Sequence, residues 1–123
     1  MGIGRIDLRL ALAALCLLQA GMAPAQEQKT VKEPVPVFDK AFLSSKKNVA
    51  AGKTVWDNQC RHCHGAAAYP GKAPKLNPGQ LAPDFIYDRV TNGFGKMPAW
   101  KEVFSAEQRR SVVAYIKSGD FSP

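Results

Sequence analysis

Hydrophobic and polar positions alternate along residues 49–59 with the period of an α-helix. Val49, Gly52, Val55, Trp56 and Gln59 follow one another at steps of mostly three and four residues, so they share one face of a helix. Polar and charged residues fill most of the other positions. The pattern predicts a helix over residues 49–59 that packs through this face.

A second amphipathic segment lies near the C-terminus. Ser105 is a predicted N-cap, and Gln108 three residues later completes the sequence pattern of a capping box. The apolar stripe and the glycine that ends the helix follow at Val112, Tyr115, Ile116 and Gly119.

A shorter helix is predicted over residues 84–90, introduced by Pro83 and closed by Asn92 and Gly93. From Tyr69 to Pro83 the chain has four prolines and two glycines, which predicts a loop. No strand-like alternation persists anywhere in the sequence, so we expect a small all-α domain.

The N-terminus has the pattern of an export signal. Arg5 and Arg9 precede an apolar run from Leu10 to Ala20, and residues 23–25 form an A-x-A cleavage site. The 16 residues from Leu10 to Ala25 are fewer than the roughly 20 that a membrane-spanning helix needs, which argues against the alternative of an uncleaved anchor. We therefore expect cleavage after Ala25, a periplasmic protein and no stable membrane anchor.

Residues 26–47 have a different composition, with five lysines, Pro34, Pro36 and few apolar side chains. This predicts a flexible leader between the signal peptide (1–25) and a single folded domain (48–123). The alternative is that the short apolar cluster at residues 35–38 packs over the domain or contacts a partner.

The candidate chemistry lies in Cys60-Arg61-His62-Cys63-His64. Two cysteines two residues apart, followed directly by a histidine, are the attachment signature of c-type haem. The two thiols form thioether bonds with the porphyrin vinyl groups, and His64 then lies over the ring where it can ligate iron. A zinc site or a redox dithiol is the competing interpretation, and the export signal favours haem.

Removal of residues 1–25 leaves few other candidate ligands. The remaining cysteines and histidines all lie in the motif, and Met97 is the only methionine left. The second axial ligand must therefore be Met97, His62, a lysine or none. We favour Met97, because it lies in a glycine-rich loop just before Pro98 rather than at helical spacing among apolar residues.

These features together resemble the small monohaem class I cytochromes c of the bacterial periplasmic type, over residues 48–119. The matching positions are Gly52, Trp56, Cys60, Cys63, His64, Gly65, Pro74, Leu76, Met97, Pro98, Trp100 and Tyr115. The resemblance implies a fold of three or more helices around one covalently bound haem c. It also implies that the Pro74 carbonyl accepts a hydrogen bond from the His64 ring, that Leu76 packs on the porphyrin and that Trp100 lies beside the distal ligand.

Size makes such a cofactor structurally important. Only 98 residues remain after residue 25, and a domain this small buries a limited core. We expect the haem to complete the core and its absence to leave an unfolded or molten chain. The candidate wall residues are Leu76, Phe85, Ile86, Phe94 and Trp100.

Charge bears on the partner. The chain has a net charge of +7, which becomes +6 when residues 1–25 are removed. Cations flank the predicted ligand segments at Arg61, Lys72, Lys75, Lys96 and Lys101. This predicts a docking face for a redox protein with an acidic surface, against the alternative of an ordinary solvated surface. No nucleic-acid motif appears.

Two axial ligands leave no open iron site, so we expect a monomeric electron carrier and not an enzyme. It would transfer electrons between a dehydrogenase or a quinol-oxidising complex and a terminal oxidase or reductase. The alternative is a haem subunit held in a dehydrogenase, such as a quinoprotein, or in an oxidase. A peroxidase or gas sensor would require an open distal site.

Overall fold

The computed structural model describes Met1, residues 33–66 and residues 71–121. The predicted signal peptide and residues 26–32 of the predicted leader therefore lie outside the described residues, apart from Met1. Within the described ranges the elements are helical, with one isolated bridge between Phe94 and Met97, and the prediction of an all-α fold is confirmed. The helices are α1 (Lys40–Ser44), α2 (Lys46–Val55), η1 (Trp56–Cys60), α3 (Arg61–His64), α4 (Pro83–Asn92) and α5 (Ala106–Lys117).

The predicted helix over 49–59 is part of a longer one. Helical structure continues without a break from Lys46 to His64 and passes through a five-residue π-helical segment, η1. Ser45 caps the start by accepting a hydrogen bond from the Asn48 backbone N–H (3.5 Å). The apolar period ends at Gln59 because the next turn carries the cysteine–histidine motif, and so the sequence predicted the helix end too early.

The other two predicted helices are present with nearly the expected bounds. α5 begins with the predicted capping box: the Ser105 hydroxyl accepts from the Gln108 N–H (3.2 Å), and the Gln108 side chain accepts from the Ser105 N–H (2.9 Å). α4 has Pro83 in its first turn and ends at Gly93, whose φ of 73° requires a glycine. None of the helices in the described part of the chain is long and apolar enough to cross a bilayer.

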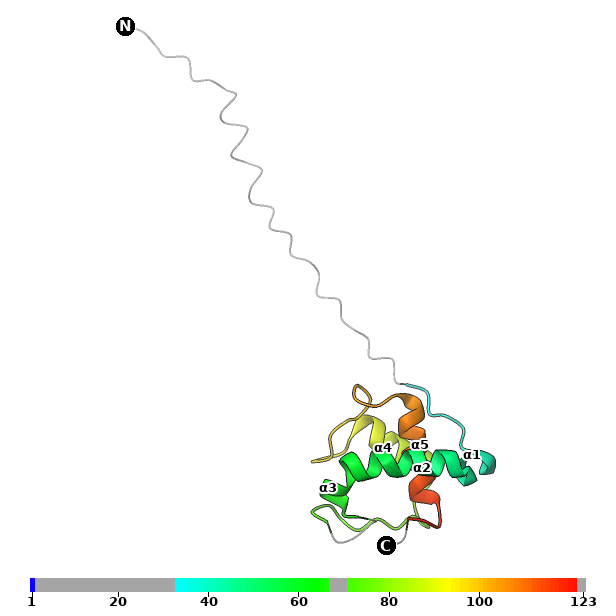
Figure 1. The fold of residues 1–123 in the computed structure, drawn as a ribbon. Helices are drawn as coiled ribbons and strands as arrows, with labels where there is room; N and C mark the ends of the chain where they lie inside the picture. The colour runs from blue at the N-terminus through cyan, green and yellow to red at the C-terminus, as the bar shows by residue number, and fades with distance from the viewer. Residues whose placement is uncertain (2–32, 67–70, 122–123) are drawn as a thin grey trace. The chain divides into compact units, whose positions relative to one another are not determined.

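α2 and α5 form the central packing of the domain, and Figure 1 shows them crossing. The contact is close because Gly52 has no side chain: a Cβ there would lie 1.8 Å from the Ser111 carbonyl oxygen. Around this crossing, Trp56 packs edge-on against Phe121 with ring centroids 4.8 Å apart, and Tyr115 packs against both. The core therefore lies around this crossing, and it includes Phe121 and the buried residues Ile86, Tyr87 and Val90 of α4.

Residues 33–47, predicted as part of a flexible leader, are packed on the domain. We call residues 33–39 the N-terminal strap. The Glu33 carboxylate accepts hydrogen bonds from Arg109 Nη2 of α5 (2.6 Å) and from the Tyr87 hydroxyl of α4. Phe38 packs against the Tyr87 ring at 5.8 Å, and α1 follows directly. Residues 33–47 therefore make defined contacts with the domain, as in the alternative in which the apolar cluster at residues 35–38 packs over it.

The physical reason lies in α5. Arg109 occupies a core position of the helix, three and four residues before Val112 and Val113, and only 2% of its surface is exposed. A charge buried to this degree needs a counter-charge. Glu33 provides it, and this long-range pair could not be inferred from the sparse apolar residues of the leader.

Candidate haem site

Cys60, Cys63 and His64 occupy consecutive turns of one helix. Cys60 ends η1, and the other two lie in α3, so the two thiols and the imidazole project at helical steps of three and four residues. Neither cysteine forms a disulfide with a described residue; Cys60 is half-buried and Cys63 is exposed. Burial raises the pKa of the Cys60 thiol to about 11.

The π-helical segment sets the rotation of this motif. The Arg61 N–H donates to the Trp56 carbonyl five residues earlier, one residue wider than an α-helical bond. Such a wide turn changes the angle between the residues on either side of it. Trp56 therefore remains in the core of the α2–α5 crossing while Cys63 reaches the surface.

His64 has an unusual polar environment. Its Nδ1 atom is buried and has no hydrogen-bond partner among the described residues. Burial lowers the pKa of His64, which keeps the imidazole neutral at neutral pH, the form that binds a metal. The hydrogen bond that the family resemblance implies, from this ring to the Pro74 carbonyl, is not formed, and Pro74 is exposed.

The backbone around His64 is held from two sides. On one side, the Trp56 indole N–H donates to the carbonyls of Gly65 (3.2 Å) and Ala66 (3.1 Å). On the other, the Ala73 N–H donates to the Cys63 carbonyl (2.9 Å). Gly71 makes the second approach possible, since a Cβ there would lie 2.2 Å from the same carbonyl oxygen.

Met97 lies at the base of a tight turn that follows α4. Phe94 and Met97 exchange two backbone hydrogen bonds of 3.0 and 2.9 Å, and Gly95 has a φ of 57° at the tip of the turn. Gly93 is required for contact within this loop: a Cβ would lie 2.5 Å from the Met97 carbonyl oxygen. The Trp100 N–H then donates to the Val90 carbonyl (3.1 Å), which ties the loop back to α4.

The predicted wall residues fall into two groups. Ile86 is buried, and Leu76 and Trp100 are half-buried against the core. Phe85 and Phe94 are 46% and 69% exposed, and the Arg89 guanidinium lies over both rings at 4.9 and 4.5 Å. Two exposed phenyl rings on either side of one cation are apolar surface that the described protein does not cover.

These residues fit a c-type haem. The fit rests on two thiols and an imidazole on one stretch of helix, with a buried ring nitrogen that has no protein partner. The Met97 thioether lies in a hydrogen-bonded turn at a different point of the fold. Apolar side chains such as Phe94 are exposed. Groups of three or more His, Cys, Asp or Glu able to hold a metal ion are absent from the described ranges.

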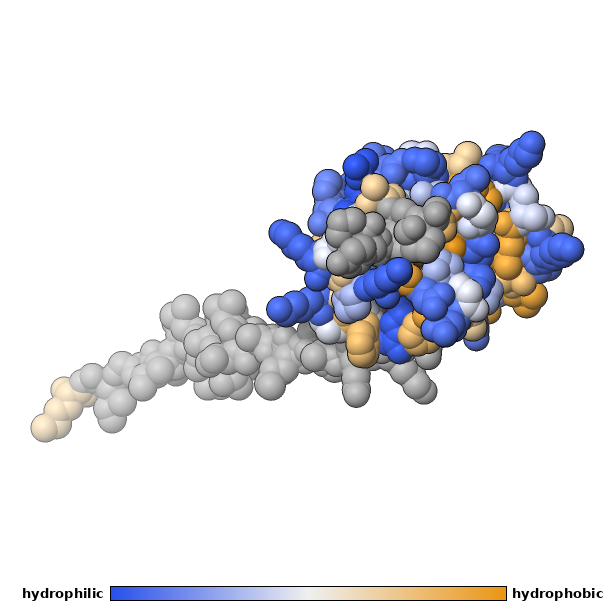
Figure 2. All heavy atoms as spheres, turned by 90° about the horizontal axis from the view of Figure 1, so that it is seen from below, coloured by the Kyte–Doolittle hydropathy of each residue, from blue (hydrophilic) through white to orange (hydrophobic). Residues whose placement is uncertain are grey.

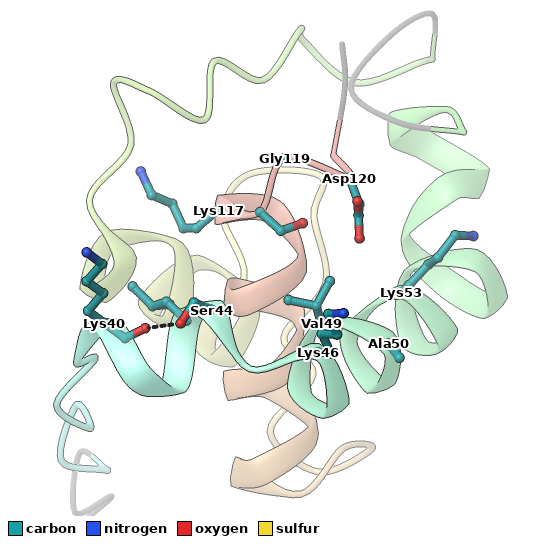
Figure 3. Close-up of a pocket in the computed structure, with 11 residues that line it drawn as sticks. Lys40, Ser44, Lys46, Val49, Ala50, Lys53, Lys117, Gly119 and Asp120 are labelled. Carbon is teal, nitrogen blue, oxygen red and sulfur yellow. Dashed lines mark hydrogen bonds between the residues drawn. The ribbon is translucent and has the colours of Figure 1, made fainter.

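A separate hollow of about 800 Å³ lies between α1, α2 and the end of α5. Figure 3 shows lysines from all three helices around it, among them Lys46, Lys53 and Lys117. Lys53 pairs with Asp57 at 2.5 Å, and Lys117 donates to the Pro78 and Leu81 carbonyls at 2.5 and 2.9 Å. The predicted haem residues do not line this hollow.

Sequence reasoning missed three features of the site. It identified Trp56 as a packing residue but gave no signal for the indole hydrogen bonds. It did not identify Gly71, because a close backbone approach across a loop leaves no local pattern. It also missed the π-helical segment, which no periodicity in residues 56–60 indicates.

The comparisons with known proteins agree with this geometry. The family model described as cytochrome C oxidase, cbb3-type, subunit III matches residues 47–116. Cytochrome c6 of Rippkaea orientalis is 36% identical over 76 residues, which cover 56% of this chain and 68% of that protein. The cytochrome c subunit of 4-cresol dehydrogenase (hydroxylating) of Pseudomonas putida is 35% identical over 69 residues, 55% of this chain and 59% of that protein.

A solved structure, the c-type cytochrome NirC, is similar in fold. Its TM-score is 0.51 at 23% identity, and the match covers 64% of this chain and 99% of that one. The matched family, the relatives and the fold lead to the same conclusion. This chain belongs to the cytochrome c family as a small monohaem class I cytochrome c, an electron-transfer protein and not an enzyme, whose cofactor is one covalently bound haem c.

Proposed function

We propose that this protein is a periplasmic one-electron carrier whose haem is held by Cys60 and Cys63 and ligated by His64 and Met97. The observation that carries the proposal is the helical motif itself, in which the two thiols lie beside an imidazole with an unpartnered buried nitrogen. The bound haem would supply an iron that alternates between the ferrous and ferric states. The residues of the chain would fix it and set its environment.

Each proposed ligand has a separate chemical role. His64 would give a neutral imidazole from a helix that is anchored to the core through Trp56. Met97 would give a soft thioether sulfur, which favours ferrous over ferric iron and raises the reduction potential. With both axial positions filled, a substrate would have no place to bind, and this agrees with electron transfer rather than catalysis.

The remaining predicted haem contacts differ in how well the geometry supports them. Leu76 and Trp100 are half-buried at the edge of the core, and Trp100 stacks on Phe104 with centroids 5.4 Å apart. Pro74 is exposed and lies one residue after Ala73, which is hydrogen-bonded to the motif. We retain all three as proposed contacts, with Pro74 dependent on a shift of its loop toward His64.

The ligation proposal predicts the behaviour of a Met97→Ala variant. The covalent haem should remain, because the thioether bonds do not involve Met97. The long-wavelength sulfur-to-iron charge-transfer band should disappear, and the reduction potential should fall. A pyridine haemochrome assay gives the haem content of both proteins, and an Ala99→Gly variant in the same loop is the control. An unchanged charge-transfer band in Met97→Ala would exclude Met97 as the ligand.

The partner is proposed to be a redox protein with an acidic docking face. The five cations that flank the ligand segments, Arg61, Lys72, Lys75, Lys96 and Lys101, are all exposed. Cys63 is exposed as well, so this end of the motif lies at the surface. Figure 2 shows one mainly hydrophilic face of the protein with smaller apolar areas between the polar side chains.

This docking proposal predicts a dependence on ionic strength. Attraction between exposed charges weakens as salt shortens the Debye length from about 10 Å at 0.1 M. The bimolecular rate with an acidic redox protein should therefore fall as salt is added, and Lys72→Glu should lower it further. Stopped-flow mixing with an acidic and a basic redox protein measures this, and equal salt dependence for both would contradict the proposal.

Export, cleavage after Ala25 and a monomeric state are also part of the proposal. Export and cleavage rest on the charged, apolar and small-residue pattern of residues 1–25. Mass spectrometry of the protein from a periplasmic extract would give the mature N-terminus, expected at Gln26.

A second candidate function is that of a haem subunit in a dehydrogenase or oxidase complex. It is favoured by the similarity to the cytochrome c subunit of 4-cresol dehydrogenase (hydroxylating). Gel filtration of the native extract separates the two. A free carrier elutes near its own mass, whereas a subunit co-elutes with a larger partner.

A further inference from the structure

Trp56 makes a polar contact that its packing role does not require. Its side chain is buried, with 1% of the residue surface exposed, and it lies four residues before Cys60. The indole N–H points at two backbone carbonyls at once, Gly65 at 3.2 Å and Ala66 at 3.1 Å. These are the two residues that follow His64.

The exit from α3 needs such a contact. The helix has only four residues and ends at His64, and Gly65 leaves it with a φ of 85°. Carbonyl groups at a helix end have no partner within the helix. In this chain a side chain from the core takes part of that role, and so the path of the backbone after His64 depends on Trp56.

In this structure the hydrogen bond to Pro74 is not formed, and the imidazole has few other contacts among the described residues to orient it. Its Nδ1 has no hydrogen-bond partner among the described residues, so the ring direction follows from the backbone and from ring contacts. Trp56 supplies a ring contact too, with centroids 5.6 Å apart and planes inclined by 39°. The Trp56 side chain therefore contacts both the His64 ring and the backbone of the two residues that follow His64.

Trp56 is itself held rigidly. Phe121 packs edge-on against it, and Tyr115 of α5 packs at 6.1 Å. Both neighbours are buried at the α2–α5 crossing. The indole thus connects the most tightly packed part of the domain to the turn that leaves the haem motif.

We propose that Trp56 is a positioning residue that fixes the orientation of the His64 imidazole through its indole N–H. This inference rests on the proposed ligation of iron by His64. The proposed role goes beyond packing: a phenylalanine ring would fill much of the space of the Trp56 indole but would lack its N–H donor. The carbonyl of the exposed Ala66 can be hydrated when the donor is lost, so the main effect is on geometry rather than on folding.

The test compares Trp56→Phe with Tyr115→Phe in the full-length haem-loaded protein. Both changes lie in one aromatic cluster, and only the first removes the contact with the His64 exit. Hyperfine-shifted proton resonances of the oxidised protein report the orientation of the axial imidazole. We expect Trp56→Phe to shift these resonances and the reduction potential, and Tyr115→Phe to leave both near their wild-type values. Equal changes in the two variants would overturn the proposal.

A second measurement examines the hydrogen bond without substitution. In ¹⁵N-labelled protein the Trp56 indole proton should exchange with deuterium many times more slowly than that of the half-buried Trp100. Equal exchange rates would remove the basis of the proposal. Slow exchange in a protein whose spectra exclude His64 ligation would leave the hydrogen bond but overturn the positioning role, and the failure would then lie in the proposed ligation.

Discussion

Glycines set the local geometry of this site because they have no side chain. Gly65 adopts a φ of 85° directly after His64, a conformation that few other residues tolerate. Gly71 has an ordinary φ but no room: the Cys63 carbonyl and the His64–Gly65 peptide lie where its Cβ would be. The first constraint is torsional and the second is steric, and both act on the backbone that carries the haem motif.

Gly71→Ala should destabilise the protein by about 1–3 kcal/mol, because the added methyl meets backbone atoms at 2.2 to 2.7 Å and they cannot move independently of the motif. Gly79→Ala, in the same loop, is the control, since its nearest neighbour is a flexible Asn77 side chain at 3.7 Å. That change should stay within about 1 kcal/mol of wild type. Urea unfolding of the two haem-loaded variants measures the difference, and equal midpoints would contradict the steric argument.

The observed helices agree with those predicted from the sequence where their signals lie within a few residues of one another. The apolar face of α2 and the capping box of α5 could both be predicted from the sequence, because periodicity and capping depend on residues only a few positions apart. The continuation of α2 through η1 and α3 could not be predicted, since residues 60–64 carry the cysteine–histidine motif in place of an apolar face. Local periodicity could not predict the close approach at Gly52, because it depends on a partner 59 positions away, Ser111.

Gly52→Ala tests the crossing of α2 and α5. Alanine would gain about 1 kcal/mol of helix propensity. A Cβ 1.8 Å from the Ser111 carbonyl would cost more, about 3 kcal/mol, by forcing the helices apart. The net expectation is a loss of stability and a lower thermal midpoint. Gly119→Ala has no atom within 4 Å and should be close to neutral. A stabilised Gly52→Ala would mean that the helices can separate at little cost.

At the scale of the whole molecule, the strap makes the chain before α2 part of the folded unit. Arg110 of α5 adds to the Glu33 anchor: its guanidinium lies over the Phe42 ring at 4.0 Å and donates to the Val37 carbonyl at 3.4 Å. The family model matches only from residue 47 onward, so the strap lies outside the matched region. Periodicity could not indicate the strap, because it is held by single contacts to distant residues rather than by a periodic face.

Glu33→Gln should lower the free energy of unfolding by about 1–3 kcal/mol, because loss of the charge leaves Arg109 buried without a counter-ion. Breaking a fully buried pair costs about 3–5 kcal/mol. The 35% exposure of the Glu33 side chain reduces that value. Glu107→Gln is the matched control, because Glu107 pairs with Arg110 at the surface and is 64% exposed. It should change the free energy of unfolding by about 1 kcal/mol or less. Equal effects of the two variants would show that the strap contributes little.

The same pair predicts a pH dependence. The hydrogen bond from Tyr87, and after it the Arg109 guanidinium, lowers the pKa of Glu33, while burial opposes this shift. The stabilisation is therefore present above the usual carboxyl pKa and is lost as the pH falls through the lowered value. The stability difference between wild type and Glu33→Gln should be constant near neutral pH and should shrink in acid. Denaturant titrations at several pH values measure it, and a difference that grows in acid would contradict this sign.

Haem attachment should also affect the whole fold. A Cys60→Ser, Cys63→Ser double variant cannot form thioether bonds, and the exposed Phe85 and Phe94 rings would stay uncovered. We expect such a chain to lose near-ultraviolet circular dichroism and to bind a hydrophobic dye, the properties of a loosely packed state. Native-like packing in the double variant would show that the helices alone form a sufficient core.

The strap and Phe121 together anchor both ends of residues 33–121. Phe121 is 3% exposed between two aromatic rings, and Glu33 is paired with a buried cation. Chain termini usually open first, at little free-energy cost, and this is where proteases begin. In this domain a protease that digests inward from either end would stop at the two anchors, because going further requires the core itself to open. Digestion should therefore leave one resistant fragment.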